Sequence, residues 1–277
     1  MAYNRLYRVN SDWWLENENS WHPLETADVA RFMAGTQSAS DLVASAGVSS
    51  AAPSTDQLDA PLLDQELWGA GVTYQRSQAA LIGESTTASV YDAVYSAPRP
   101  QTFFKGAPGK AVGHGGVIGV RGDSHWTAPE TELCIVMDPA GRIIGYTLAN
   151  DVTARDVEAV NPLYQPQSKV YRGSCSVGPC LVLAGEGVDP LSWSVSLRLI
   201  RGSECFYEGN AEFSSLNRTL EELAATLYAF NDLPGGAIIC TGTDIIPPDT
   251  AGLEDGDIVE MHCAEIGTLT TPVKRWS

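Results

Sequence analysis

The stretch from residue 132 to residue 148 constrains the fold of this chain more than any other. Residues 132–137 (ELCIVM) form a short apolar run, residues 139–141 (PAG) suit a tight turn, and residues 142–148 (RIIGYTL) are apolar again. Two such runs around a turn predict a β-hairpin. Further strands are predicted at 177–184, 193–201, 236–241 and 257–263, and one clear helix at 216–230, where leucines recur every three or four residues. The sequence therefore predicts a mostly β fold with peripheral helices (α+β), closer to a rolled sheet or sandwich than to a doubly wound fold.

A domain boundary is expected near residue 60. A chain of 277 residues has room for about two domains. Residues 47–60 (GVSSAAPSTDQLDA) are small and polar and contain proline, which is typical of a linker. Residues 1–25 suggest one or two short strands, and Thr26 suits the N-cap of a helix that follows. We predict a small N-terminal α/β domain over residues 1–60 and a β-roll domain, carrying the candidate site, over residues 61–277.

Charge and composition exclude several classes of partner. The chain has 17 basic and 34 acidic residues, a net charge of −17, which disfavours nucleic acid and an anionic membrane surface. A small anionic substrate stays open, because one focused site can oppose the field of the whole protein. No run approaches about 18 apolar residues, and the N-terminus lacks the apolar segment of a signal peptide. The six cysteines match no zinc spacing, which favours reduced thiols in the cytoplasm.

Three carboxylates lie at the open end of the predicted hairpin, where its first strand begins and its second strand ends. Glu130 and Glu132 enter its first strand, where residues two apart project on the same face. Two carboxylates at one spot repel each other unless a cation lies between them. Asp151 follows the second strand, so it can reach the same place and complete a three-oxygen site for Mg²⁺ or Mn²⁺. The alternative is a solvated acidic edge, which holds no metal.

Other candidate residues lie in segments that are rich in glycine or in aromatic residues. Only four lysines occur, and two of them, Lys105 and Lys169, stand beside segments expected to be buried. A buried lysine can act as a base, although a lysine that reaches the surface explains the same pattern. Thr243, in the turn Cys240–Thr243, and His114, among glycines, could contact a ligand or be purely structural.

These motifs, in this order, resemble the fumarylacetoacetate hydrolase superfamily over residues 62–275. The resemblance rests on Glu130-Thr-Glu132, Asp151, Lys169, Thr241-Gly-Thr243, and the closing residues 256–260, 266–269 and 272–273. It implies that family's mixed β-sandwich roll with a small N-terminal domain, and assembly as a homodimer or homotetramer. It also implies Mg²⁺, with Mn²⁺ or Ca²⁺ as alternatives, held by Glu130, Glu132 and Asp151.

Several segments are similar to one branch of the superfamily, which dehydrates 2-keto-3-deoxy sugar acids. They are residues 67–74 (LWGAGVTY), 91–94 (YDAV), 112–115 (VGHG), 126–127 (WT) and 158–169 (EAVNPLYQPQSK). The hydrolases and decarboxylases of the superfamily carry a His–Glu pair in a lid motif, where this chain has Ser77 and Ala80. In the dehydratase branch an acid precedes the Phe-Phe-Lys run, where this chain has Gln101, so the proton path and exact substrate stay open.

The resemblance implies an enzyme, a metal-dependent hydro-lyase. It would convert 2-keto-3-deoxy-D-arabinonate (xylonate) to 2,5-dioxopentanoate, also called α-ketoglutarate semialdehyde, in oxidative pentose degradation. Lys169 and Glu132 are the implied catalytic residues, with Lys169 taking the proton from C3. The implied substrate-binding residues are Thr73, Gln101, Lys105, His114 and Thr243.

Two alternatives stay open at this point. The same metal site would serve a C–C hydrolase or a decarboxylase of β-diketo or 2-oxo acids, and the missing His–Glu pair is the feature that separates the two reactions. A sugar-acid-binding regulator could keep the fold without the chemistry. Such a binder would have no use for a lysine base beside a metal.

Overall fold

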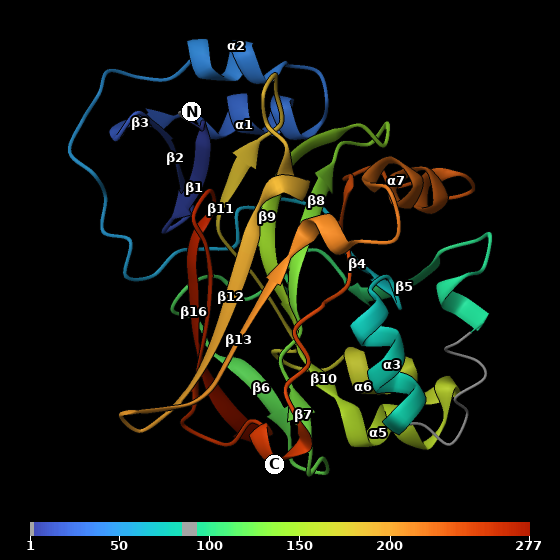
Figure 1. Ribbon diagram of the computed structural model, residues 1–277. Coiled ribbons are helices and arrows are strands. Elements are labelled where there is room, and N and C mark those ends of the chain that lie inside the picture. The colour runs from blue at the N-terminus through green and yellow to red at the C-terminus, as the bar shows by residue number, and fades with distance from the viewer. Residues whose placement is uncertain (1–2, 85–92) are drawn as a thin grey trace.

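Strands are the main regular elements of the computed structural model, which describes residues 3–84 and 93–277 (Figure 1). The strands are β1 (Arg5–Val9), β2 (Asp12–Asn17), β3 (Ser20–Leu24), β4 (Glu66–Gly71), β5 (Gln101–Gly106), β6 (Ile118–Arg121), β7 (Thr127–Ala128), β8 (Thr131–Met137), β9 (Ile143–Asp151), β10 (Thr153–Ala154), β11 (Cys175–Leu183), β12 (Ser194–Arg201), β13 (Glu204–Glu212), β14 (Ala237–Cys240), β15 (Ile258–Cys263) and β16 (Gly267–Trp276). The helices are α1 (Thr26–Met33), α2 (Ala39–Ala44), α3 (Gln75–Glu84), α5 (Arg155–Val160), α6 (Gln165–Lys169) and α7 (Leu220–Tyr228), with short 3-10 turns between them.

Two sheets pack against each other and enclose the main core. The larger has the strand order β3-β2-β1-β11-β9-β8-β14-β4-β5, and the smaller β13-β12-β15-β16-β6. Their paired strands run antiparallel, apart from β14–β4 and β16–β6, and a third small sheet joins β7 to β10. Figure 1 shows the long β12–β13 hairpin crossing in front of β9 and β11, with the helices at the periphery. The predicted mixed β-sandwich roll is therefore confirmed.

Strand β8 is buried on both faces, which explains its unbroken apolar sequence. Leu133, Ile135 and Met137 face the core between the two sheets. Cys134 and Val136 face a second core, formed with the N-terminal strands and helices. Glu132 lies two residues before Cys134, so its side chain points to the side of the second core, where the apolar row ends. A polar site can form at this end of the strand.

The predicted hairpin and most of the predicted strands are confirmed. Strands β8 and β9 pair antiparallel, with Thr131 opposite Asn150. The predicted helix at 216–230 is shorter and begins at Leu220, because the Thr219 side chain caps it by accepting the Glu222 backbone N–H. The predicted cap at Thr26 is wrong: Thr26 is already helical, and Glu25 takes the N-cap position.

Strand β13 has no counterpart in the sequence prediction. Its residues Glu204–Glu212 are exposed or half-buried, because β13 lies at the edge of the smaller sheet. Such a strand carries polar residues and glycine, so its sequence lacks the apolar run by which buried strands are recognised.

The N-terminal strands extend the larger sheet. Strand β1 pairs with β11, with Arg5 opposite Val182, and β2 and β3 follow outward. Helices α1 and α2 cover this part, as the upper part of Figure 1 shows. Their buried residues Val29, Phe32 and Leu42 belong to the second core. Whether residues 1–60 also fold as a separate domain stays a prediction. Within the described residues, every helix is too short or too polar to cross a bilayer.

Burial of the cysteines leads to a first prediction. All six are free, and all except the half-buried Cys205 are buried. Burial raises the pKa of Cys134 to about 11 and that of Cys180 to about 12, so these thiols stay protonated and unreactive. We expect dithionitrobenzoate at pH 8 to modify Cys205 alone in the folded protein, and all six cysteines once denaturant is added. Rapid modification of several thiols without denaturant would contradict the described packing.

Candidate active site

Three carboxylates from the β8–β9 hairpin meet at one end of the larger sheet. Glu132 lies in β8, Glu130 immediately precedes that strand, and Asp151 ends β9. The Asp151 backbone N–H donates to the Glu130 carbonyl at 2.9 Å, so the hairpin pairing places their side chains next to each other. One carboxylate oxygen from each of the three lies within 4.8 Å of the others, and all three residues are buried. The structure thus brings together the three acids that the sequence groups.

The surroundings of the three acids shift their pKa values in different directions. Burial, together with the charges of Asp151 and Glu130, raises the pKa of Glu132 well above its ordinary value. Burial also opposes the ionisation of Asp151, but the nearby Lys105 and Lys169 ammonium groups outweigh it and lower the Asp151 pKa. The Gly242 backbone N–H donates to Glu132 Oε2 at 2.5 Å and fixes its orientation. The site therefore disfavours the charged form of Glu132 and favours that of Asp151.

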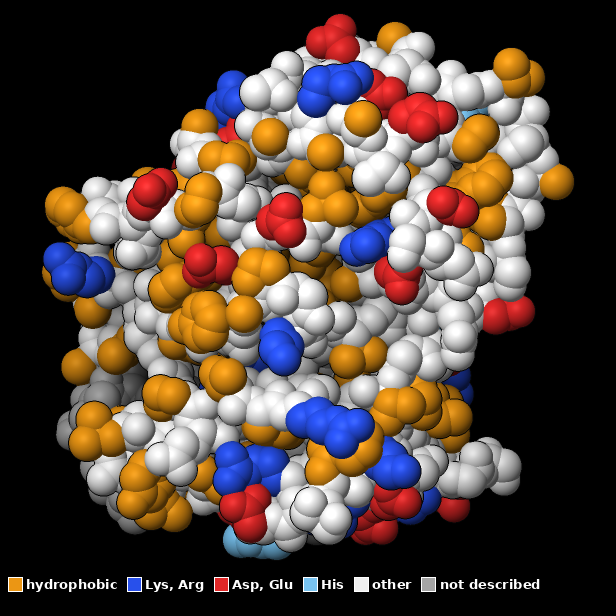
Figure 2. All heavy atoms as spheres, turned by 180° about the vertical axis from the view of Figure 1, so that it is seen from behind, with side chains coloured by type: hydrophobic (Ala, Val, Ile, Leu, Met, Phe, Trp, Pro, Cys, Tyr) orange, Lys and Arg blue, Asp and Glu red, His pale blue; other side chains and the backbone are white. Residues whose placement is uncertain are grey.

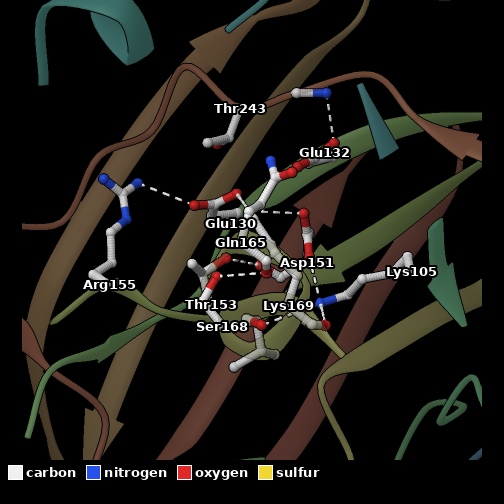
Figure 3. A network of polar contacts seen from close by, with 12 residues as sticks. Lys105, Glu130, Glu132, Asp151, Thr153, Arg155, Gln165, Ser168, Lys169 and Thr243 are labelled. Atoms are coloured by element: carbon white, nitrogen blue, oxygen red, sulfur yellow. Dashed lines mark hydrogen bonds and ion pairs between the residues drawn. The ribbon is translucent and has the colours of Figure 1, made fainter. Parts of the chain in front are cut away.

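Lys169, at the end of α6, points into this group (Figure 3). Its Nζ donates to Glu130 Oε2 at 2.6 Å and to Asp151 Oδ2 at 2.9 Å. Burial lowers the pKa of Lys169, but the charges of Asp151, Glu130 and Glu158 outweigh burial and raise it well above its ordinary value. The ammonium is therefore held by two of the three carboxylates that could bind a metal.

Lys105 lies behind the carboxylates, where it is fully buried. Its Nζ lies 2.5 Å from Asp151 Oδ1 and donates to the carbonyls of Val152, at 3.2 Å, and Lys169, at 2.5 Å. It thereby ties the end of β9 to the end of α6. Figure 3 shows it reaching Asp151 from the side opposite Arg155. Lys105 is placed to orient Asp151 and the segment carrying Lys169, not to line the cavity.

The three acids line a cavity. Of the residues predicted from the sequence, Gln101, Lys169 and Thr243 line it together with the acids, whereas Lys105, Thr73 and His114 do not. Its other polar or aromatic lining residues are Ser77, Phe103, Arg155, Glu158 and Gln165.

Thr73 and His114 have other contacts. Thr73 is buried, and its hydroxyl donates to the Thr241 carbonyl at 2.5 Å, which steadies the turn carrying Gly242 and Thr243. His114 Nδ1 accepts the Thr270 backbone N–H at 3.1 Å, and its own carbonyl accepts the N–H of Leu58. The structure thus places Thr73 behind the turn that lines the site. His114 lies in the loop between β5 and β6 and forms hydrogen bonds with Thr270 of β16 and with Leu58.

Arg155 and Glu158 are site residues that sequence reasoning missed. Both are buried in α5, which begins four residues after Asp151. Arg155 Nη2 lies 3.2 Å from Glu130 Oε1. Their spacing of three residues puts both on one face of a helix. That spacing, directly after a predicted metal ligand, was the signal available in the sequence.

The donor set fits a hard divalent cation. Three carboxylates offer oxygen ligands and leave further coordination positions for water or for substrate oxygens, as Mg²⁺ and Mn²⁺ require. The raised pKa of Glu132 fits as well, because a cation at this place relieves the repulsion among the three acids. Glu130, Glu132 and Asp151 can therefore hold a divalent cation.

Gly242 supports this site through its backbone, so its replacement is informative. Its φ of +98° is rarely adopted by other residues, and a Cβ there would lie 1.9 Å from Thr73 Oγ1. Gly242→Ala must move the turn and with it the N–H that orients Glu132. We expect divalent-cation affinity to fall by about 10-fold to 100-fold, measured by calorimetric titration. Gly256→Ala, at a positive φ in open space, is the control, and unchanged affinity in Gly242→Ala would contradict the role of this turn.

Comparison with known proteins identifies the family of this chain and several relatives. The family model described as fumarylacetoacetate (FAA) hydrolase C-terminal matches residues 68–274. The 2-dehydro-3-deoxy-D-arabinonate dehydratase of Saccharolobus solfataricus is 44% identical over 219 residues, 78% of this chain and 74% of that protein. The probable 2-keto-3-deoxyxylonate dehydratase of Haloferax volcanii is 43% identical over 213 residues, 77% of this chain and 73% of that protein.

Solved structures agree with the sequence matches. A 2-keto-3-deoxy-D-arabinonate dehydratase complexed with magnesium and 2,5-dioxopentanoate superposes with a TM-score of 0.84 at 35% identity, covering 100% of this chain and 99% of that one. The apo form of a dehydratase of the same name gives a TM-score of 0.85 at 35% identity over both whole chains.

Proposed function

The chain belongs to the fumarylacetoacetate hydrolase family, and within it we propose a metal-dependent dehydratase acting on a 2-keto-3-deoxy sugar acid. The substrate is 2-keto-3-deoxy-D-arabinonate (xylonate), and the product is 2,5-dioxopentanoate. The observation that carries this proposal is the buried Glu130–Glu132–Asp151 group with Lys169 beside it. It supplies a cation site and a candidate base in one cavity, in a chain 44% identical to a dehydratase of this kind.

The residues of the cavity have different roles in the proposed reaction. A divalent cation on the three carboxylates supplies Lewis acidity, which polarises the C2 carbonyl of a 2-keto acid and acidifies its C3–H. Lys169 would be the base for this proton, because a cation held by Glu130 and Asp151 would offset the negative charges that favour the protonated form of Lys169. Glu132 acts as a ligand that Gly242 keeps in place.

Further residues bind and orient the substrate. The Thr243 hydroxyl and the Gln101 amide line the cavity and bind substrate oxygens. Gln101 Nε2 donates to Gln165 Oε1 at 3.0 Å, so the two amides form one polar wall of the cavity. This wall would face the hydroxyl-bearing end of the substrate. Thr73 and Lys105 act indirectly, Thr73 through the turn that carries Thr243 and Lys105 through Asp151.

The hydrolytic alternative lacks its water-activating pair. Ser77 lines the cavity at the position where the hydrolases of the superfamily carry a histidine, and a hydroxyl is not a base near neutral pH. Ala80, three residues further along α3, has no carboxylate. Nothing else that lines the described cavity forms a His–Glu pair.

A product assay tests the proposed function. Purified protein is incubated with 2-keto-3-deoxy-D-arabinonate and Mg²⁺, and 2,5-dioxopentanoate is followed through a coupled semialdehyde dehydrogenase, with pyruvate measured in parallel. We expect semialdehyde without pyruvate, and none in EDTA. If the protein instead cleaves an acylpyruvate or decarboxylates oxaloacetate and forms no semialdehyde, the hydrolase or decarboxylase hypothesis replaces the proposed dehydratase function.

We also propose that the enzyme is a cytoplasmic homodimer or homotetramer. Free thiols support a reducing compartment. Phe104 and Val170 are exposed large apolar residues that line one further cavity, and Leu163 and Tyr164 are exposed near α6. Figure 2 shows hydrophobic side chains gathered in several groups on one face of the molecule, as subunit contacts require. Light scattering coupled to size exclusion measures the state, and a monomer at micromolar concentration would contradict it.

A further inference from the structure

One carboxyl group in the cavity does not belong to the three carboxylates (Glu130, Glu132 and Asp151) that could hold a cation. Glu158 is 5% exposed and lines the cavity from α5. No hydrogen bond or ion pair joins its side chain to another of the described residues, whereas Glu130 and Asp151 each contact Lys169. A buried carboxyl group without a protein partner, facing a cavity, has its hydrogen-bonding capacity free for a ligand.

The surroundings of Glu158 favour its protonated form. Burial is the largest cause, and it raises the pKa of Glu158. The charges of Lys169 and Arg155 oppose burial, but the net shift is upward. A protonated carboxyl group can donate a proton to a ligand, which an ionised one cannot.

The reaction needs such a donor. A hydroxide ion is a poor leaving group, so loss of the C4 hydroxyl is assisted by a group that protonates it as the C–O bond breaks. Gln101 and Gln165 are amides with no acidic proton, and Arg155 stays protonated in proteins. Glu130, Glu132 and Asp151 are the proposed ligands of the cation. Lys169 is the proposed base at C3. Glu158 is the one remaining carboxyl group among the described residues that line this cavity.

We propose that Glu158 is the general acid that protonates the departing C4 hydroxyl, an inference that rests on the proposed dehydration. In this step Lys169 takes a proton from C3, and the electron pair of that C–H bond forms the C3=C4 double bond. The C4–O bond breaks, and its electron pair takes the proton of Glu158. Water leaves, Lys169 becomes an ammonium and Glu158 a carboxylate.

The same group then completes the reaction. The Glu158 carboxylate removes a proton from C5, and the double bonds shift so that Lys169 returns its proton to C3. This leaves an enol at C4=C5, which becomes the aldehyde when C4 gains a proton and the C5 hydroxyl loses one. Both residues return to their starting forms, and the overall change is the loss of one water. No oxidant or reductant is required.

The experiment separates removal of the C3 proton from loss of the hydroxyl. Two rates are measured in D₂O with Mg²⁺ by proton NMR: formation of 2,5-dioxopentanoate from the sugar acid, and exchange of the C3 protons of 2-oxopentanoate, which has no hydroxyl to lose. The variants are Glu158→Gln and Glu158→Asp. Glu186→Gln, an exposed carboxyl without an ion pair, is the matched control. Calorimetric titration with Mg²⁺ checks that the cation still binds.

We expect Glu158→Gln to lower dehydration by about 100-fold or more and to leave C3 exchange within about threefold of wild type. Glu158→Asp should recover part of the dehydration rate, and it replaces Glu158→Gln if that variant does not fold. Dehydration within about threefold of wild type in Glu158→Gln would overturn the proposal. An equal fall of both rates would also overturn it, because that result indicates a positioning role. Wild-type protein that forms no semialdehyde would instead refute the proposed function itself.

Discussion

Replacing Lys169 by alanine is expected to lower the dehydration rate by about three orders of magnitude and to leave divalent-cation binding intact. Lys169 Nζ is the one amine that lines the cavity among the described residues, so no other side chain there can take over as an amine base. The three carboxylates keep their positions, because Lys105 still holds Asp151 and Gly242 still orients Glu132. Turnover is measured by the coupled assay, and Mg²⁺ binding by calorimetric titration.

The same variant has an effect on stability that depends on the metal. Without Lys169, Glu130 loses a contact of 2.6 Å and Asp151 one of 2.9 Å to a buried ammonium. Loss of one partner of a buried ion pair costs roughly 3–5 kcal/mol. In EDTA the variant should therefore melt well below wild type, and Mg²⁺ should raise its melting temperature more than it does for wild type.

Lys110→Ala is the matched control, because Lys110 is exposed and lies outside the cavity. Its turnover and melting temperature should match wild type in both conditions. Near-normal turnover in Lys169→Ala would rule out Lys169 as the base.

Removal of the divalent cation is the second large effect. We expect EDTA to abolish dehydration, a loss of at least about 1000-fold, because Lewis-acid stabilisation contributes several kcal/mol to the transition state. Added Mg²⁺ should restore the rate fully in wild type. Glu132→Gln keeps the shape of the side chain but loses its charge, so it should bind Mg²⁺ weakly and recover little activity.

Glu204→Gln, an exposed carboxyl of the edge strand β13, controls for the loss of one negative charge. It should respond to EDTA and Mg²⁺ as wild type does. Full activity of wild type in EDTA, after exhaustive dialysis, would contradict a metal-dependent reaction. Wild-type Mg²⁺ affinity in Glu132→Gln would contradict the role of Glu132 as a ligand.

The hairpin that carries the metal group could be predicted because its information is local. An apolar run, a turn and a second apolar run fix two paired strands, and alternation along a strand puts Glu130 and Glu132 on one side. Asp151 follows from the length of the second strand. The edge strand β13 could not be predicted, because solvent on its outer side removes the apolar signal.

What the sequence alone determined is therefore the β-rich fold, the hairpin, the three acids and the candidate base Lys169. The tertiary structure decided which other residues surround the three acids and Lys169. Only the packed chain shows Lys105 behind Asp151, His114 away from the cavity, and Glu158 lining it without a partner among the described residues. The physical reason is that spacing along the chain reports neighbours on one strand or helix. Contacts between β5, α5, α6 and the hairpin depend on how separate elements pack, which no local pattern records.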